Sequence, residues 1–180
     1  MVTPLTPRRL DDVDRATTPS LAEREEDEAY SKAMKRAGRL LAARSRSEHE
    51  IRDRLGRAGF EAPVVDRVVD RLRDLRLIDD LDFARRWVAE RSASRGPVLL
   101  AAELRGKGVA EDTIQDALVA ARRDEAAAAA ERAGTWVPRV ADRPLHEQAA
   151  RIQEMLLRRG FSYDAAAEAA RAVLPPEGWD

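Results

Sequence analysis

Between residues 32 and 57 the chain gathers side chains that could hold phosphates. Nine lysines and arginines stand there against three acids, whereas the whole chain of 180 residues has a formal net charge of −1. Clustered cations of this kind bind nucleic acid through its backbone, without reading its sequence. We therefore expect weak, sequence-tolerant binding of nucleic acid, with a merely solvated helix face as the alternative. The candidates are Lys32, Lys35, Arg36, Arg39, Arg44, Arg46, Arg52, Arg54 and Arg57.

No other group of residues forms a pattern typical of catalysis or metal binding. Asp79, Asp80 and Asp82 could hold a cation, but aspartates at a helix start usually cap it. The histidines, His49 and His146, are far apart in a chain without cysteine, so we expect no zinc site. Neither a serine nucleophile with an oriented base nor a phosphate-binding glycine loop is found. We expect a binding protein without metal, cofactor or enzymatic activity.

A repeat centred on three glycines predicts the helices that must position these cations. Gly59, Gly108 and Gly160 follow one another at intervals of 49 and 52 residues. Aliphatic residues eight and four positions before each glycine share a helix face, and a large apolar residue follows it. A glycine at this place ends a helix in the left-handed conformation. The matching residues are Ile51, Leu55 and Phe60; Leu100, Leu104 and Val109; and Ile152, Leu156 and Phe161.

A period near fifty residues predicts tandem helical units, and we expect each unit to share a hydrophobic core with its neighbours. Charged residues at 36% and aromatic residues at 4% suit thin helical units better than one thick core. The expected fold class is all-α, an elongated array of three tandem three-helix repeats. The predicted segments are a disordered arm (1–19), three repeat units (20–76, 77–121 and 122–174, the last with an inserted loop at 134–144) and a tail (175–180).

Capping signals and an aromatic pair add detail to the predicted helices. Ser20 with Glu23, and Ser47 with Glu50, can each form a capping box at a helix start. Phe83 and Trp87 are four residues apart and therefore lie on one helix face. Exposed rings could stack on bases, but apolar neighbours on the same face favour packing in the core.

Cysteine usage and apolar runs bear on the compartment. The chain has no cysteine and no apolar run long enough for a signal peptide or a membrane span. The absence of cysteine excludes disulfides. We expect a cytoplasmic, monomeric protein without a membrane partner.

Taken together, several motifs resemble the RecX family. The resemblance covers roughly residues 34–174, and its most specific part is the run Leu-Ile-Asp-Asp-x-x-Phe-Ala-x-x-Trp from Leu77 to Trp87. The other matching motifs are Ser47-x-x-Glu50-Ile51, Arg91, Gly96-Pro97, Glu103-Leu104-x-x-Lys107-Gly108-Val109 and Arg158-Arg159-Gly160-Phe161.

The resemblance implies a bacterial regulator of the RecA recombinase made of three tandem three-helix repeats. Such a protein binds RecA or its filament on single-stranded DNA. It limits filament growth, strand exchange and ATP hydrolysis in homologous recombination, DNA repair and the SOS response. The family has no known catalytic residues. The long acidic N-terminal part and the insertion at 134–144 depart from the family pattern, so no function is carried over to them.

Two other classes of function remain open. Three-helix units with a glycine turn also form helix-turn-helix DNA-binding proteins, which would act without a recombinase partner. That alternative needs polar side chains on an exposed recognition helix, whereas the third helix of the first unit carries Val64, Val65, Val68 and Val69. A helical enzyme is the other class, and no catalytic constellation supports it.

Overall fold

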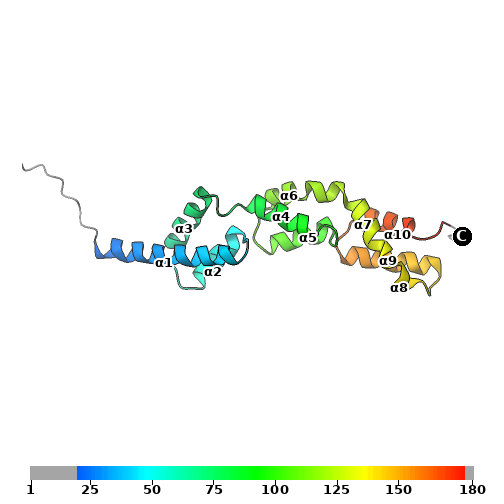
Figure 1. Ribbon diagram of the computed structural model, residues 1–180, viewed down its shortest axis with the longest axis horizontal. Coiled ribbons are helices and arrows are strands. Elements are labelled where there is room, and N and C mark those ends of the chain that lie inside the picture. Colours follow the sequence, from blue (N-terminus) through cyan, green and yellow to red (C-terminus); the bar gives the residue numbers. More distant parts are fainter. Residues whose placement is uncertain (1–19, 177–180) are drawn as a thin grey trace, which may run out of the picture.

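A computed structural model describes residues 20–176 of the chain, in which helices are joined by short turns and linkers (Figure 1). It contains ten α-helices and no strand, which confirms the all-α prediction. The arm expected at 1–19 and the last four residues of the expected tail lie outside the described residues. The helices are α1 (Leu21–Ala43), α2 (Glu48–Gly56), α3 (Ala62–Asp74), α4 (Asp80–Arg91), α5 (Pro97–Arg105), α6 (Glu111–Arg123), α7 (Glu125–Gly134), α8 (Val137–Val140), α9 (Leu145–Arg158) and α10 (Tyr163–Ala172).

Local side chains account for most helix starts. Ser20 and Ser47 form capping boxes with the residues three positions later, as predicted. Asp79 caps α4, since its side chain accepts a hydrogen bond from the Asp82 amide at 2.9 Å. Proline occupies the first turns of α3 and α5, where its missing amide costs no hydrogen bond.

The hydrophobic core is divided into three separate clusters, so the expectation that neighbouring units share one core was wrong. The first lies among α1, α2 and α3, the second among α4, α5 and α6, and the third among α7, α8, α9 and α10. Each cluster is built around the aliphatic pair that precedes its glycine. These pairs are Ile51 and Leu55, Leu100 and Leu104, and Ile152 and Leu156, all completely buried.

The three repeat glycines close three turns of the same kind. Their φ angles are +87° at Gly59, +73° at Gly108 and +79° at Gly160, in the left-handed region that favours glycine. In each turn, the amide after the glycine donates back to the carbonyl of the buried leucine four positions before the glycine, at 3.2–3.3 Å. This is the Schellman arrangement that satisfies free carbonyls at a helix end.

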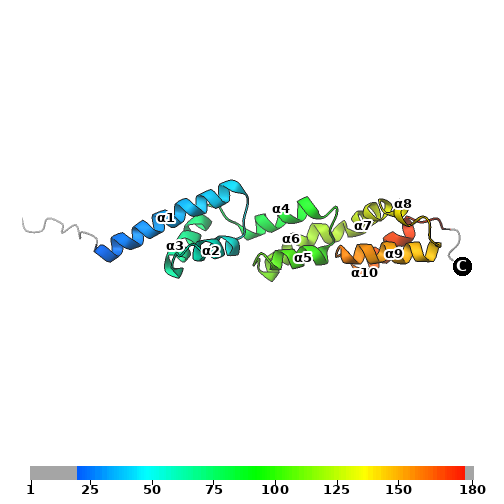
Figure 2. The same ribbon diagram turned by 90° about the horizontal axis from the view of Figure 1, so that it is seen from below.

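The helices around each cluster form one group: α1 to α3, α4 to α6, and α7 to α10. In each group, the helix that precedes the repeat glycine, called here the middle helix, lies end to end with the corresponding helix of the next group. Figures 1 and 2 show α2, α5 and α9 following one another in a line, with the start of α2 at the end of α5 and the start of α5 at the end of α9. The Gly96 amide donates to the Arg159 carbonyl at 2.8 Å, and the Val98 amide to the Gly160 carbonyl at 3.0 Å. Amides that are free at one helix start are therefore satisfied by carbonyls that are free at another helix end.

The third group departs from the other two. A single residue, Asp124, separates α6 from α7, so these helices form a nearly continuous rod between the second and third groups. The region expected as an inserted loop at 134–144 contains the short helix α8. Trp136 and Val140 from this region are buried in the third cluster, because they fill space beside a helix rich in alanine.

Two glycine substitutions should distinguish the destabilisation caused by backbone strain in the turn from the destabilisation caused by a clash at the contact between groups. Alanine at either position must adopt a positive φ, which costs about 1–2 kcal/mol. Open space surrounds the missing Cβ at Gly59, whereas a Cβ at Gly108 would overlap the His49 side chain. We therefore expect Gly108→Ala to lower the free energy of unfolding by at least about 1 kcal/mol more than Gly59→Ala, measured by urea denaturation.

The exposed side chain of His49 supplies the control. The overlap at Gly108 includes the His49 Cβ, so the control background is His49→Gly, in which the difference in cost between the two glycine substitutions should shrink. An equal cost of both substitutions in the original background would show that the junction does not depend on the glycine.

Candidate nucleic-acid interface

The outer face of α1 carries a stripe of basic side chains. Lys32, Lys35, Arg36 and Arg39 follow the i, i+3, i+4, i+7 spacing that places residues on one face of a helix. The opposite face of α1 holds the buried Ala33 and Ala37 with their apolar neighbours, which pack into the first cluster. The stripe therefore points away from the core because the apolar face of the same helix is held against α2 and α3.

The nine predicted cations differ in whether an acid already neutralises them. Four form ion pairs within the first two groups: Lys32 with Glu28 at 2.7 Å, Arg44 with Glu50 at 2.9 Å, Arg52 with Glu48 at 2.9 Å and Arg57 with Asp53 at 2.8 Å. A fifth, Arg46, donates to the Leu40 carbonyl at 3.1 Å. Among residues 20–176, no ion pair or side-chain hydrogen bond engages the remaining four, Lys35, Arg36, Arg39 and Arg54.

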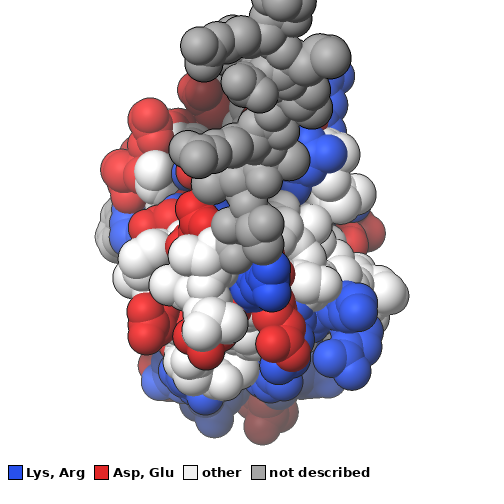
Figure 3. All heavy atoms as spheres, turned by 90° about the vertical axis from the view of Figure 1, so that its left-hand side faces the viewer, with Lys and Arg blue, Asp and Glu red and all other residues white. Residues whose placement is uncertain are grey.

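Arg46 links the stripe on α1 to the arginines around α2. Its contact with Leu40 holds the guanidinium against α1. Burial, and then the charges of Arg44 and Arg54, lower the pKa of Arg46, while Glu50 partly opposes them. Like charges thus converge here, and an anion would relieve their repulsion. Seen from the α1 end of the molecule, lysine and arginine side chains gather along one edge, and acidic side chains lie mostly on the other side (Figure 3).

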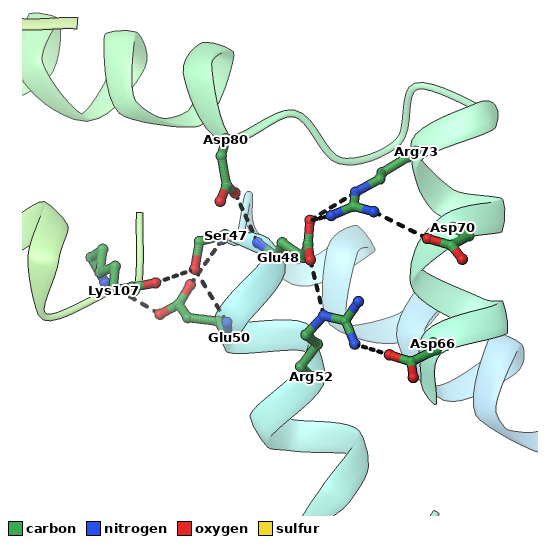
Figure 4. A network of polar contacts seen from close by, with 9 residues as sticks. All are labelled: Ser47, Glu48, Glu50, Arg52, Asp66, Asp70, Arg73, Asp80 and Lys107. Atoms are coloured by element: carbon green, nitrogen blue, oxygen red, sulfur yellow. Dashed lines mark hydrogen bonds and ion pairs between the residues drawn. The ribbon is translucent and has the colours of Figure 1, made fainter. Parts of the chain in front are cut away.

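A buried polar contact joins the first group to the second (Figure 4). The Ser47 hydroxyl donates to the Lys107 carbonyl at 2.6 Å and accepts from the Glu50 amide at 3.2 Å. The Glu50 carboxylate accepts from Arg44 at 2.9 Å and from the Lys107 ammonium at 3.3 Å. Sequence reasoning found the capping box in this site but missed Lys107, because 57 residues separate Lys107 from Glu50.

Glu48 organises the other half of this junction (Figure 4). Its amide donates to the Asp80 carboxylate at 2.8 Å, which ties the start of α2 to the start of α4. Its carboxylate accepts from Arg52 at 2.9 Å and from Arg73 at 2.8 Å. Arg52 also pairs with Asp66. The Arg52 charge is therefore committed to two carboxylates and is poorly placed to bind a phosphate.

The aromatic pair on α4 is largely covered. Phe83 is buried in the second cluster, and its ring centroid lies 6.0 Å from that of Trp87. The Trp87 indole donates to Glu103 at 2.9 Å, while the Arg91 guanidinium lies 3.5 Å and the Lys107 ammonium 4.2 Å from the indole centroid. A base could stack on this indole only by displacing a cation from it.

Asp79, Asp80 and His49 occupy structural positions. Asp79 and Asp80 are engaged at the starts of α4 and α2, and His49 lies against Gly108. Within residues 20–176, no group of three or more histidine or acidic side chains could hold a metal ion. None of the helices in that range has the length and apolar character needed to cross a membrane.

The charge of Glu50 should make stability depend on pH. Burial acts to raise the pKa of Glu50, but hydrogen bonds and charge from Arg44 and Lys107 outweigh it and lower the pKa from 4.5 to about 2. A depressed pKa stabilises the fold above the unfolded value of 4.5, and this contribution is lost as pH falls through the folded value. Glu50→Gln keeps a capping side chain and removes the charge.

We therefore expect Glu50→Gln to lower the free energy of unfolding by up to about 2–3 kcal/mol near neutral pH. The difference from the original chain should shrink as pH falls from about 5 towards 2, as measured by urea denaturation at several pH values. Glu168→Gln on α10 is the control, since Glu168 is exposed and forms no ion pair within residues 20–176. If the difference in free energy of unfolding between the variant and the original chain stays constant across this pH range, the charge of Glu50 contributes nothing to stability.

Comparisons with known proteins agree with this architecture. Residues 33–72 match the family model "RecX, first three-helix domain", and residues 79–118 match "RecX, second three-helix domain". A regulatory protein RecX from Mycobacterium ulcerans is 41% identical over 146 residues, which cover 77% of this chain and 83% of that protein. One from Mycobacterium leprae is 37% identical over 166 residues, which cover 88% and 92%.

Solved structures show the same fold. The crystal structure of RecX from Lactobacillus salivarius superimposes with a TM-score of 0.77 at 23% identity, covering 82% of this chain and 97% of that one. This likeness concerns the fold, whereas the identity to the mycobacterial proteins over more than two thirds of both chains concerns the family. The chain therefore belongs to the RecX family of regulatory proteins.

Proposed function

We propose that this protein inhibits the RecA recombinase by binding RecA or its filament on single-stranded DNA. The observation that carries the proposal is a set of four exposed cations that have no acid partner within residues 20–176. They are Lys35, Arg36, Arg39 and Arg54, on the first group of a chain that belongs to the RecX family. Free cations on one face can contact phosphates or acidic side chains without first breaking an ion pair.

The elongated shape suits a repetitive partner. The three helix groups follow one another along the long axis, so a single molecule can contact neighbouring subunits or nucleotides of a filament (Figures 1 and 2). Binding alone shifts a filament equilibrium only by the difference in affinity between assembled and disassembled states. Inhibition of filament growth, strand exchange and ATP hydrolysis would follow from tighter binding to the inactive arrangement.

The alternative of a helix-turn-helix DNA reader has weaker support. In α3, the valines that would have to be replaced by base-reading side chains are buried, at 0–6% exposure. Its outer face carries Asp66, Asp70 and Asp74 beside its arginines, and Arg67 and Arg73 are ion-paired. A helix with this charge pattern is poorly suited to enter a DNA groove. We further propose that the protein acts as a monomer in the cytoplasm, the compartment in which RecA filaments form.

Charge reversal on the α1 stripe tests the proposal. Arg36→Glu with Arg39→Glu should weaken binding to single-stranded DNA and lower the salt slope by about 0.7 for each phosphate that the variant no longer binds. The same variant should inhibit RecA less, measured as ATP turnover and strand exchange on single-stranded DNA. Arg123→Glu with Arg139→Glu is the matched control, because these exposed arginines lie on α6 and α8, away from the stripe.

A DNA competitor distinguishes contact with the recombinase from competition for the strand. If inhibition persists when excess DNA saturates the protein's own DNA binding, direct contact with RecA carries the function. If inhibition disappears, competition for the strand is sufficient. Unchanged RecA turnover at every ratio of the two proteins would contradict the proposal and favour the DNA reader.

A further inference from the structure

The glycine turn of the first group matches the other two in geometry but differs from them in its surroundings. At Gly160 and Gly108, the space beside the turn is occupied by Leu99 at the start of α5 and by His49 at the start of α2. At Gly59, apart from the glycine and its two neighbours in the chain, no atom of the described residues lies within 4 Å of the position where a Cβ would stand. One of three equivalent helix ends is therefore open.

The two occupied turns show what kind of group fits. The carbonyl before each glycine accepts a hydrogen bond from the start of another helix: Arg159 from the Gly96 amide and Lys107 from the Ser47 hydroxyl. The equivalent carbonyl in the first group is that of Ala58, and no hydrogen bond from residues 20–176 reaches it or the Gly59 carbonyl. Free carbonyls at a helix end carry partial negative charge, which attracts the positive start of another helix.

A cavity lies beside the open turn. It has a volume of about 480 Å³ and is bounded by the first turns of α1 and by the segment from Gly59 to Val64. Phe60 is partly exposed there, whereas Val109 and Phe161, its counterparts in the other turns, are 5% and 3% exposed. The apolar side chain that follows the glycine is thus buried in the other two groups but accessible in the first.

The rim of the cavity is acidic. Glu25, Glu26 and Glu61 all line it, and among the described residues only Glu26 has an ion-pair partner, Arg67. Two carboxylates therefore face the cavity without a neutralising cation from residues 20–176. The start of a helix brings a positive dipole end, and a basic side chain beside it would add a full positive charge.

We infer that the Gly59 turn is a docking site for the start of an α-helix from a partner protein. The helix would begin with a small capping residue, glycine or serine, preceded by a basic side chain. Its first amides or its hydroxyl would donate to the Ala58 and Gly59 carbonyls, and its first apolar side chain would cover Phe60. This surface is separate from the basic stripe on α1 and has the opposite charge, so the inference does not rest on the function proposed above.

The chain itself supplies a probe. A synthetic peptide of residues 93–105 begins with Ala93, Ser94 and Arg95, followed by the Gly96-Pro97 helix start that fills the turn of the third group. We would add this peptide to the isotopically labelled full chain and follow backbone amide resonances by NMR. Because short helices are marginally stable alone, binding should be weak, with saturation in the millimolar range. We expect saturable shifts at residues 58–64 and 22–29.

Two variants should each reduce the affinity for the peptide roughly tenfold. Gly59→Asn tolerates the left-handed conformation and places a side chain over the carbonyls, which blocks the site. Glu25→Lys with Glu61→Lys reverses the charge of the rim. Glu168→Lys with Glu147→Lys is the control for charge, and circular dichroism checks that each variant is folded.

Three results would overturn the inference. The first is the absence of shifts at the Gly59 turn up to several millimolar peptide, or the same shifts with a peptide of scrambled sequence. The second is a response confined to residues 159–161, which would mean that the peptide replaces α5 in its own junction. The third is a change of the Gly59 resonance with protein concentration in the absence of peptide, which would identify a second copy of this chain as the occupant.

Discussion

Unsatisfied backbone groups at helix ends are the constraint on which this structure depends. Each helix leaves several amides free at its start and several carbonyls free at its end. In this chain the middle helices satisfy some of these groups in one another. Amides at the start of α5 donate hydrogen bonds to carbonyls at the end of α9, and the hydroxyl at the start of α2 donates one to a carbonyl at the end of α5. The three hydrophobic clusters stay separate, and the connection between them is made through polar contacts at helix ends and the nearly continuous α6 and α7.

This arrangement explains why the glycines are spaced as they are. A left-handed residue is needed to turn the chain after each buried leucine, and glycine adopts that conformation without strain. At Gly108 and Gly160, glycine is also needed because a neighbouring helix start lies where a side chain would be. Gly59 meets only the first of these requirements within the described chain, so its surroundings differ although its backbone does not.

The same junctions decide which charges are free to bind a partner. Glu48 and Glu50 hold Arg44, Arg52, Arg73 and Lys107 in the contact between the first two groups. Those ion pairs are partly buried, and partial burial makes them more costly to disrupt than fully exposed pairs. The outer face of α1 is not drawn into this network, and its cations remain exposed. A positive face and an acidic helix start thus lie on one helix, separated by about two turns.

Much of the fold could be predicted from local patterns. Capping boxes at Ser20 and Ser47, the cap at Asp79 and the glycine turns were all predictable, because each depends on residues within one or two helical turns. The helical face of Lys32, Lys35, Arg36 and Arg39 also follows from spacing alone. The short helix α8 was missed, since burial of Trp136 and Val140 depends on α9 and α10 rather than on their own neighbours in sequence.

The sequence by itself therefore determined the helical class, the positions of the turns and the excess of positive charge between residues 32 and 57. The pairs of Lys32, Arg52 and Arg57 with an acid four residues away follow from spacing along one helix. Only the tertiary structure decided that Arg52 also pairs with Asp66 of α3 and that Lys107 reaches Glu50, because these partners come from other helices. It also decided that each group keeps its own core and that two glycine turns are filled while one is open. Periodicity reports which face of a helix is apolar, whereas contacts between helix ends depend on distances in space that no local pattern encodes.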